Sequence, residues 1–264
     1  MKKLTALILS LIMAFTLCAC GGKETSDESD LAYVQGKGKL IVGITEFNPM
    51  DYRDASDPTG WIGFDADVAK AFADSLGVDI EFIEIDWDNK IMELNSKSVD
   101  CLWNGMTLTP EVLNSMATTK PYCNNAQVVV LNADVADNYK DEESIKDLSF
   151  AVESGSAGEV VATEKGFNTV AVLTQADALM EVASGTSDAC IIDLLMAGAM
   201  IGEGTSYPQL TYTMELTSEE YGVGFRQGSE LAEKFNEFYK AAFESGQIQE
   251  IAEKYGVQES IICK

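Results

Sequence analysis

The stretch KLIVGI at residues 39–44, followed by FDADVAKAFADSLGVDIEFIEI at residues 64–85, decides the fold of this chain. KLIVGI predicts a buried strand. Phe64 to Leu76 carries apolar residues at helical spacing and is followed by Gly77, a residue type that commonly ends a helix. Ile80 to Ile85 then predicts a second strand. A strand, a helix and a strand in this order favour a parallel sheet with helices packed on its faces.

The same order of elements recurs further along the chain. The first unit continues with a predicted short helix at residues 89–96 and a strand at residues 101–106. The second unit reads strand, helix, strand, helix, strand, at residues 149–153, 158–165, 169–173, 175–183 and 189–192. Two units of this kind predict an α/β fold with two lobes, each a mostly parallel sheet flanked by helices.

Two further apolar strands connect these units. QVVVL at residues 127–131 lies between them, and YGVGF at residues 221–225 follows the second. We expect these strands to cross between the lobes and to act as the hinge. This division places residues 37–126 and 221–264 in lobe 1 and residues 127–220 in lobe 2.

A ligand site is expected where the strands end. In open α/β sheets, ligands bind beyond the carboxyl ends of the strands. In this chain those ends lie at residues 46–47, 104–107, 153–156 and 193. The sequence therefore predicts a cleft between the lobes at these positions.

The first twenty residues predict export from the cell. Lys2 and Lys3 form a cationic start, and residues 4–17 form an apolar run that is shorter than the roughly 20 residues of a membrane-spanning helix. The following Leu-Cys-Ala-Cys resembles a bacterial lipobox, which implies that Cys20 is lipidated. We expect residues 1–20 to be a lipoprotein signal peptide and residues 21–36 a flexible polar tether. A secreted protein cleaved nearby, without a lipid, stays an alternative.

The composition excludes several classes of function. The chain has 18 Lys and Arg against 43 Asp and Glu, so it would repel phosphate, and no nucleic-acid partner is expected. It contains no histidine, which removes His-based triads and most zinc chemistry. We expect no catalytic residues, no cofactor and no metal.

Four cysteines remain beyond the predicted lipidation site, and none has CxxC spacing. An exported protein permits disulfides, and four cysteines allow three pairings. We interpret them first as small strand residues and second as disulfide partners, with the pairing left open: Cys101, Cys123, Cys190 and Cys263.

The order of short motifs resembles the polar amino-acid family of solute-binding proteins, the bacterial extracellular solute-binding protein family 3, which serves ABC importers. The resemblance runs from about Lys37 to Tyr255. It is carried by Gly43 to Met50 (GITEFNPM), Gly63-Phe64-Asp65 with Asp67, Trp87, Asp100 to Thr109 (DCLWNGMTLT), Lys120-Pro121-Tyr122, Ser154-Gly155-Ser156, Asp188 to Asp193, Tyr221-Gly222 and Gly246 to Tyr255.

The resemblance implies a role for individual residues. The ligand's amino group would lie against the carboxylate of Asp193 and the backbone carbonyl of Gly105, which suits an ammonium with three donors and no acceptor. Thr107 would bind the other end of the ligand. The remaining predicted site residues are Glu46, Phe47, Trp87, Asn104, Glu153, Ser154 and Ser156.

These residues have different tasks and alternatives. Phe47 and Trp87 would wall the pocket, while the amides that follow Ser154 and Ser156 would favour an anion at a helix start. Two alternatives stay open: Asp193 as the N-cap of a following helix, and Trp87 as an ordinary core residue.

The chain departs from the family at the carboxylate clamp. Family members usually carry an arginine three residues after the second Thr of the Thr-x-Thr segment, and Val112 stands there. Ala157 likewise replaces a hydroxyl residue, while Glu46 and Glu153 add negative charge. One hypothesis is therefore a positively charged ligand, either a basic amino acid or an amine without a free carboxylate. The alternative is an ordinary polar amino acid held by Thr107 and the amides near Ser156.

The resemblance implies a monomeric binding protein rather than an enzyme. It would be anchored by its lipid to the outer face of the cell membrane, close on a small ligand by hinge motion and deliver it to the transmembrane subunits of an ABC permease. A dehydratase-like enzyme on the same scaffold is the competing hypothesis. Its chemistry would depend on Glu46, Glu153 or Asp193 with shifted pKa values.

Overall fold

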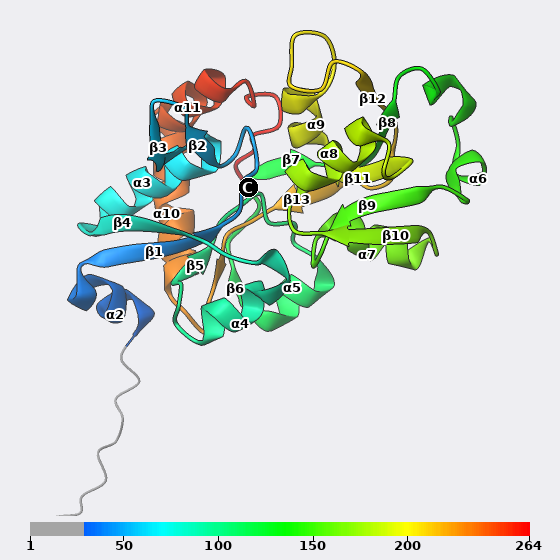
Figure 1. Ribbon diagram of the computed structural model, residues 1–264. Coiled ribbons are helices and arrows are strands. Elements are labelled where there is room, and N and C mark those ends of the chain that lie inside the picture. The colour runs from blue at the N-terminus through cyan, green and yellow to red at the C-terminus, as the bar shows by residue number, and fades with distance from the viewer. Residues whose placement is uncertain (1–28) are drawn as a thin grey trace, which may run out of the picture.

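Residues 29–264 are described by a computed structural model and build two five-stranded sheets (Figure 1). The predicted signal peptide, the predicted lipidation site Cys20 and residues 21–28 of the predicted tether lie outside the described residues. Within the described part of the chain, no helix has both the length and the apolar character that crossing a membrane requires.

The first sheet is formed by β1 (Lys39–Ile44), β4 (Asp79–Glu84), β5 (Cys101–Leu102), β6 (Ala117–Thr118) and β14 (Gly224–Phe225), in the order β4-β1-β5-β14-β6. β14 is antiparallel to both of its neighbours, whereas β1 is parallel to β4 and β5. The other elements of this lobe are β2 (Tyr52–Asp54), β3 (Asp57–Ile62), α3 (Phe64–Leu76), the short 3-10 turn η1 (Trp87–Asn89), α4 (Lys90–Asn95), α5 (Pro110–Ser115), α10 (Leu231–Glu244) and α11 (Gln247–Tyr255).

The second sheet is formed by β8 (Gln127–Asn132), β9 (Ser149–Glu153), β10 (Asn168–Val172), β11 (Ala189–Asp193) and β12 (Leu210–Glu215), in the order β10-β9-β11-β8-β12. Here β8 is the strand that is antiparallel to both neighbours. The helices of this lobe are η2 (Ala136–Asn138), α6 (Glu142–Ile145), α7 (Ala157–Glu164), α8 (Gln175–Ser184) and α9 (Leu194–Met200). The prediction of two α/β lobes with mostly parallel sheets is confirmed.

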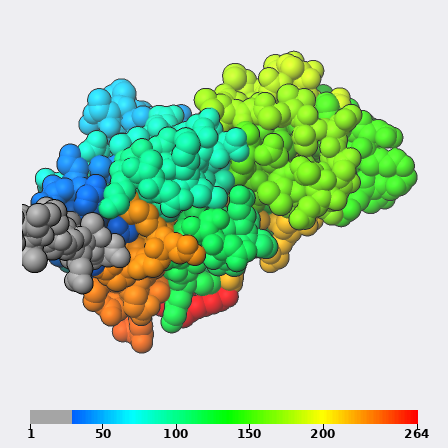
Figure 2. Space-filling model, turned by 90° about the horizontal axis from the view of Figure 1, so that it is seen from below, coloured from blue at the N-terminus to red at the C-terminus, as the bar shows by residue number. Residues whose placement is uncertain are grey.

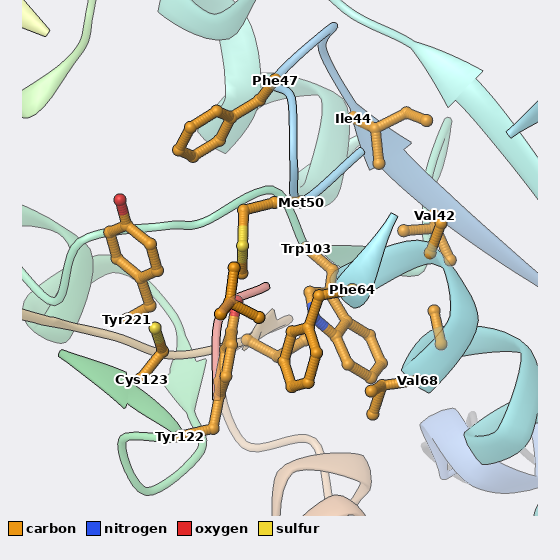
Figure 3. Close-up of a cluster of buried hydrophobic side chains, with 14 of the residues drawn as sticks. Val42, Ile44, Phe47, Met50, Phe64, Val68, Trp103, Tyr122, Cys123 and Tyr221 are labelled. Carbon is orange, nitrogen blue, oxygen red and sulfur yellow. The ribbon is translucent and has the colours of Figure 1, made fainter. Parts of the chain in front are cut away.

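Aromatic side chains fill the core of the first lobe. Phe64, Val68 and Phe72 recur at four-residue spacing on α3, so they share the face that the helix turns toward the sheet. The ring centroids of Phe72 and Phe235 are 5.5 Å apart, and those of Trp103 and Phe235 are 4.9 Å apart. Figure 3 shows Phe64 and Val68 beside Trp103 in this cluster. The packing holds α3 and α10 on one body, although they are far apart in the chain.

The lobes are joined by a small antiparallel pair, β7 (Cys123–Asn125) and β13 (Glu219–Tyr221), which lies between the two sheets in Figure 1. The hinge strands predicted at 127–131 and 221–225 are therefore displaced by a few residues. Residues 127–131 are buried throughout and belong to a full strand of the second sheet. An apolar strand is more stable inside a sheet, because both of its faces are covered there. Figure 2 shows the two lobes in contact, with the yellow-green residues in one body and the blue, cyan and most of the orange residues in the other, while green residues occur in both.

The end of the predicted tether is structured instead of flexible. Asp30–Lys37 forms helix α2, which begins at Ser29, whose hydroxyl accepts a hydrogen bond from the amide of Ala32. The Arg226 side chain holds this helix to lobe 1, because its Nε lies 2.9 and 3.0 Å from the two carboxylate oxygens of Asp30. The tether prediction is therefore wrong from Asp30 onward, since the contact comes from a residue 196 positions away.

Candidate functional site

A pocket lies between the two lobes, at the carboxyl ends of β5, β9 and β11. It encloses about 490 Å³, including space open to solvent. Nine of its lining residues come from lobe 1: Trp87, Lys90, Asn104, Gly105, Met106, Thr107, Thr109, Glu111 and Val112. Seven come from lobe 2: Glu153, Gly155, Ser156, Ala157, Val160, Gln175 and Asp193.

Most of the residues proposed from sequence meet in this pocket. Those that line it are Trp87, Asn104, Gly105, Thr107, Glu153, Ser156 and Asp193. Glu46, Phe47 and Ser154 do not line it. Glu46 is exposed, and the amide of Ser154 donates to the carbonyl of Val172 on the neighbouring strand.

Phe47 lies behind the pocket wall and supports it. Gly105 has a φ of +54°, and a Cβ built on it would lie 2.3 Å from Cε1 of Phe47. Glycine is therefore required, because a side chain at this φ is strained and the ring leaves no room. Phe47 also packs edge-on against Tyr221, as Figure 3 shows, with ring centroids 6.3 Å apart. Its contribution is to position the Gly105 backbone.

Two buried hydrogen-bond systems hold the pocket floor. The Asp65 carboxylate accepts hydrogen bonds of 2.7 Å from the Gly105 amide and from the Tyr122 hydroxyl. Burial raises the pKa of Asp65 to about 6, against the opposing effect of these donors. Asn104 is tied to Thr45, because its Oδ1 accepts from the Thr45 amide at 3.0 Å and its Nδ2 donates to the Thr45 hydroxyl at 2.6 Å.

Asp193 is the most heavily hydrogen-bonded carboxylate of the pocket. It stands at the N-cap position of α9, but its side chain makes no capping bond there. Its oxygens instead accept from the side chains of Asn125 (2.5 Å), Gln127 (3.0 Å), Gln175 and Tyr221 (2.5 Å). The capping alternative is therefore wrong for the side chain, which is directed into a polar network beside the pocket.

Burial and the neighbouring side chains control the ionisation of Asp193. Burial and then the nearby Glu219 carboxylate raise the pKa of Asp193 to about 7, against the hydrogen bonds from Tyr221 and Gln175. The same Glu219 accepts a 3.0 Å hydrogen bond from the hydroxyl of Thr107 in lobe 1. A cation delivered to this place would meet a concentration of negative charge with little solvent to screen it.

Glu153 is a buried acid of the pocket wall that lacks a full set of partners among the described residues. Its side chain is 3% exposed, and Oε1 has no hydrogen-bond partner among residues 29–264. Burial and then the Asp193 carboxylate raise its pKa to about 8. A buried oxygen of this kind is costly unless a donor reaches it, so it marks a place where a ligand donor would be stabilising.

Sequence reasoning missed Lys90, a cation in the pocket wall. It is 6% exposed, and Nζ donates to the carbonyl of Gly155 in lobe 2 at 2.8 Å and to the carbonyl of Trp87 at 3.3 Å. The signal available in the sequence was its position three residues after Trp87, which places both on one face of a helical turn. Trp87 itself is both a pocket residue and a member of a buried cluster, so the core alternative is partly correct.

The start of α7 follows Gly155, whose carbonyl accepts from Lys90. The Ser156 hydroxyl caps the helix by accepting from the Glu159 amide at 3.1 Å. The first amides of a helix have no partner within it, and they favour negative charge. The Glu159 carboxylate already accepts from the Gly155 amide at 2.8 Å. Part of the positive potential at the start of α7 is therefore balanced by a carboxylate of the protein itself.

The four cysteines of residues 29–264 are unpaired. Cys101, Cys123 and Cys190 are buried in strands, and Cys263 is exposed. The first interpretation, small strand residues, is confirmed for the three buried ones.

Comparison with known proteins identifies the family. The sequence profile of the bacterial extracellular solute-binding proteins, family 3, matches residues 40–258. The chain belongs to this family. Among related family members, the arginine-binding extracellular protein ArtP of Bacillus subtilis (strain 168) is 30% identical over 265 residues, covering 97% of this chain and 98% of ArtP. The L-cystine-binding protein TcyA of the same organism is 28% identical over 274 residues and covers 97% of each chain.

Solved structures agree with the family assignment. A mutant of ArgBP from T. maritima has a TM-score of 0.79 at 28% identity, covering 86% of this chain and 98% of that one. The ancestral amino acid-binding protein AncCDT-1, a precursor of cyclohexadienyl dehydratase, has a TM-score of 0.78 at 29% identity, covering 86% and 99%. Val112 lines the pocket of this family 3 protein. The arginine that the resemblance led us to expect at this position is therefore absent from the pocket wall.

Proposed function

We propose that this protein captures an amino acid in the pocket between its lobes and hands it to the transmembrane subunits of an ABC importer. The observation that carries the proposal is the meeting of Asp193 from lobe 2 with Gly105 and Thr107 from lobe 1 around one pocket. A carboxylate and a backbone carbonyl suit an ammonium, which only donates hydrogen bonds. The arginine- and cystine-binding relatives support an amino acid as the ligand class.

The lobe limits and the location follow from the same proposal. Lobe 1 comprises residues 37–126 and 221–264, lobe 2 comprises residues 127–220, and β7 and β13 form the hinge. Lipidation at Cys20 would hold the protein at the outer face of the cell membrane, where an exported receptor meets its permease. We expect the protein to act as a monomer.

A thermal-shift screen of the purified protein against the common L-amino acids, L-cystine and small amines tests the ligand class. A ligand present at a hundred times its dissociation constant adds about 2.7 kcal/mol to the unfolding free energy. We expect at least one amino acid to raise the melting temperature by several degrees. The absence of any shift across the panel would contradict the proposal.

A dehydratase-like enzyme is the second candidate. It is favoured by two observations: the likeness to AncCDT-1, and the raised pKa of Glu153, which is suited to a general acid. To separate the two functions, the protein is incubated with each compound that binds, and the mass of the recovered compound is measured by mass spectrometry. An unchanged mass supports binding alone, whereas a loss of water supports the enzyme.

Replacement of Gly155 by Ala should block lobe closure. Gly155 has a φ of +73°, and an added Cβ would lie 2.6 Å from Cα of Asp88 in the opposite lobe. Because the obstacle is backbone, the lobes must separate, and we expect ligand affinity to fall about tenfold or more. Isothermal titration calorimetry measures the affinity.

The matched control is Gly166→Ala, which carries the same backbone strain without the contact. Gly166 has a φ of +70°, and no atom lies within 4 Å of an added Cβ. Both variants should lose similar stability without ligand, while only Gly155→Ala loses affinity. Equal affinities in the two variants would contradict closure into the described conformation.

A further inference from the structure

A buried lysine, Lys90, lines the pocket. Lys90 takes part in none of the ion pairs formed by residues 29–264. Its two hydrogen-bond partners are the carbonyls of Gly155 and Trp87, and an ammonium has three donors. A buried charge is costly unless it is paired, so one donor and one unit of positive charge stay available to a ligand.

The surroundings of Lys90 favour an anion at its third donor. Its partner Gly155 immediately precedes Ser156 and Ala157, which line the pocket at the start of α7. The first-turn amides of this eight-residue helix follow directly after Gly155, whose carbonyl accepts from Nζ, and free amides at a helix start favour an anion. Burial lowers the pKa of Lys90, against the opposing effect of Glu111, Asp88, Glu153 and Glu159, and none of these acids forms an ion pair with it within residues 29–264.

A second buried group of the pocket wall, Glu153, offers a hydrogen-bond acceptor to the ligand. The Oε1 atom of Glu153 has no hydrogen-bond partner within residues 29–264, and Glu153 lines the pocket from the same lobe as Asp193. The pocket wall therefore contains two acids that suit an ammonium, and one lysine beside the start of α7 that suits an anion. The pocket is complementary to a ligand that carries both charges.

We infer that Lys90 binds the carboxylate of the ligand, in place of the arginine that Val112 replaces. The substrate class is then amino acids with a free carboxylate. This inference rests on the proposed function. It narrows the ligand hypotheses drawn from the sequence, because an amine without a carboxylate would leave the buried lysine unpaired. Amino acids with neutral or cationic side chains stay within the class, since Asp193 and Glu153 tolerate additional positive charge.

The test compares each amino acid with its decarboxylated amine. The pairs are L-arginine with agmatine, L-histidine with histamine and L-cystine with cystamine, extended to the corresponding pair for any other amino acid that raises the melting temperature. Wild-type protein should bind the amino acid at least tenfold more tightly than the amine. Calorimetry gives both dissociation constants.

Variants of Lys90 then assign this preference to one side chain. Lys90→Met keeps the length of the side chain and removes its charge, and it should reduce the preference for the amino acid about tenfold or more. Lys90→Arg keeps the charge and should retain most of it. The control Lys240→Met removes an exposed lysine of α10, 71% exposed in its side chain, and should change nothing.

The outcomes separate carboxylate binding from simple bridging of the lobes. If Lys90 only joins the lobes through the Gly155 carbonyl, Lys90→Met weakens the amino acid and the amine by the same factor, which overturns the inference. Equal affinity of wild type for both members of a pair also overturns it, and this result needs no variant to fold. If no amino acid or amine binds the wild type, the proposed function fails and the inference fails with it.

Discussion

Asp193→Asn is expected to lower the affinity for an amino acid about a hundredfold or more. The change removes the negative charge that faces the ligand ammonium, and truncating a buried charge pair costs about 2–5 kcal/mol. The new amide would also place donors against the side-chain donors of Gln175 and Asn125, which now bond to the carboxylate. Calorimetry at pH 8, above the Asp193 pKa of about 7, measures the affinity with the wild-type carboxylate mostly ionised.

The control for this variant lies at the other end of the same strand. Asp188 is exposed, precedes β11 and accepts hydrogen bonds from the Ser149 amide and hydroxyl at 2.9 and 2.8 Å. Asp188→Asn should leave the affinity unchanged, because its carboxylate is remote from the pocket lining. An unchanged dissociation constant in Asp193→Asn would return Asp193 to a structural role in the network around it.

Glu153→Gln is expected to stabilise the ligand-free protein at alkaline pH. The Glu153 pKa is 4.5 in its ordinary state and about 8 in the fold, so the folded protein binds this proton more tightly than the unfolded chain. Its contribution to the free energy of unfolding is therefore largest below pH 4.5 and falls as the pH rises toward 8. Each unit of pKa corresponds to about 1.4 kcal/mol, so the penalty at pH 8 amounts to a few kcal/mol.

Gln imitates the protonated acid at every pH and avoids this penalty. Melting temperatures of wild type and Glu153→Gln should be similar at pH 5 and should differ by about 5 °C or more at pH 8, with the variant higher. Glu164→Gln, an exposed acid on α7, is the control and should follow the wild type. Parallel profiles for wild type and Glu153→Gln would contradict the assigned burial of the carboxyl group. Lys90, Asp193 and Asp177 also act on Glu153, so all profiles are compared without ligand.

Three patterns that are local in the chain predict elements with the observed bounds. The helix predicted at Phe64 to Leu76 and the strands predicted at 39–44 and 149–153 have those bounds in the structure, because apolar periodicity and a terminal glycine act over a few residues. β5 ends at Leu102 and is shorter than the predicted strand 101–106, and the backbone bends at residues 104–105, where Gly105 has a φ of +54°.

The position of the candidate site could be predicted from the sequence, but its charged residues could be predicted only in part. The rule that ligands bind beyond the ends of strands placed Gly105, Glu153 and Asp193 together without knowledge of the packing. It did not place Lys90, which reaches the pocket from a helix and bonds to a carbonyl 65 residues away. Nor did it indicate that Phe47 would lie behind Gly105, because that depends on how a ring packs in three dimensions.

The sequence by itself determined the order of strands and helices, the two-lobed fold and the end of each sheet at which the pocket lies, since these follow from periodicity along the chain. Only the tertiary structure decided that residues 123–125 and 219–221 connect the lobes, that Arg226 binds Asp30 and that Lys90 faces Gly155. The physical reason is that these features arise from contacts between residues far apart in sequence. Such contacts leave no periodic trace, because each depends on the position of one side chain against another element.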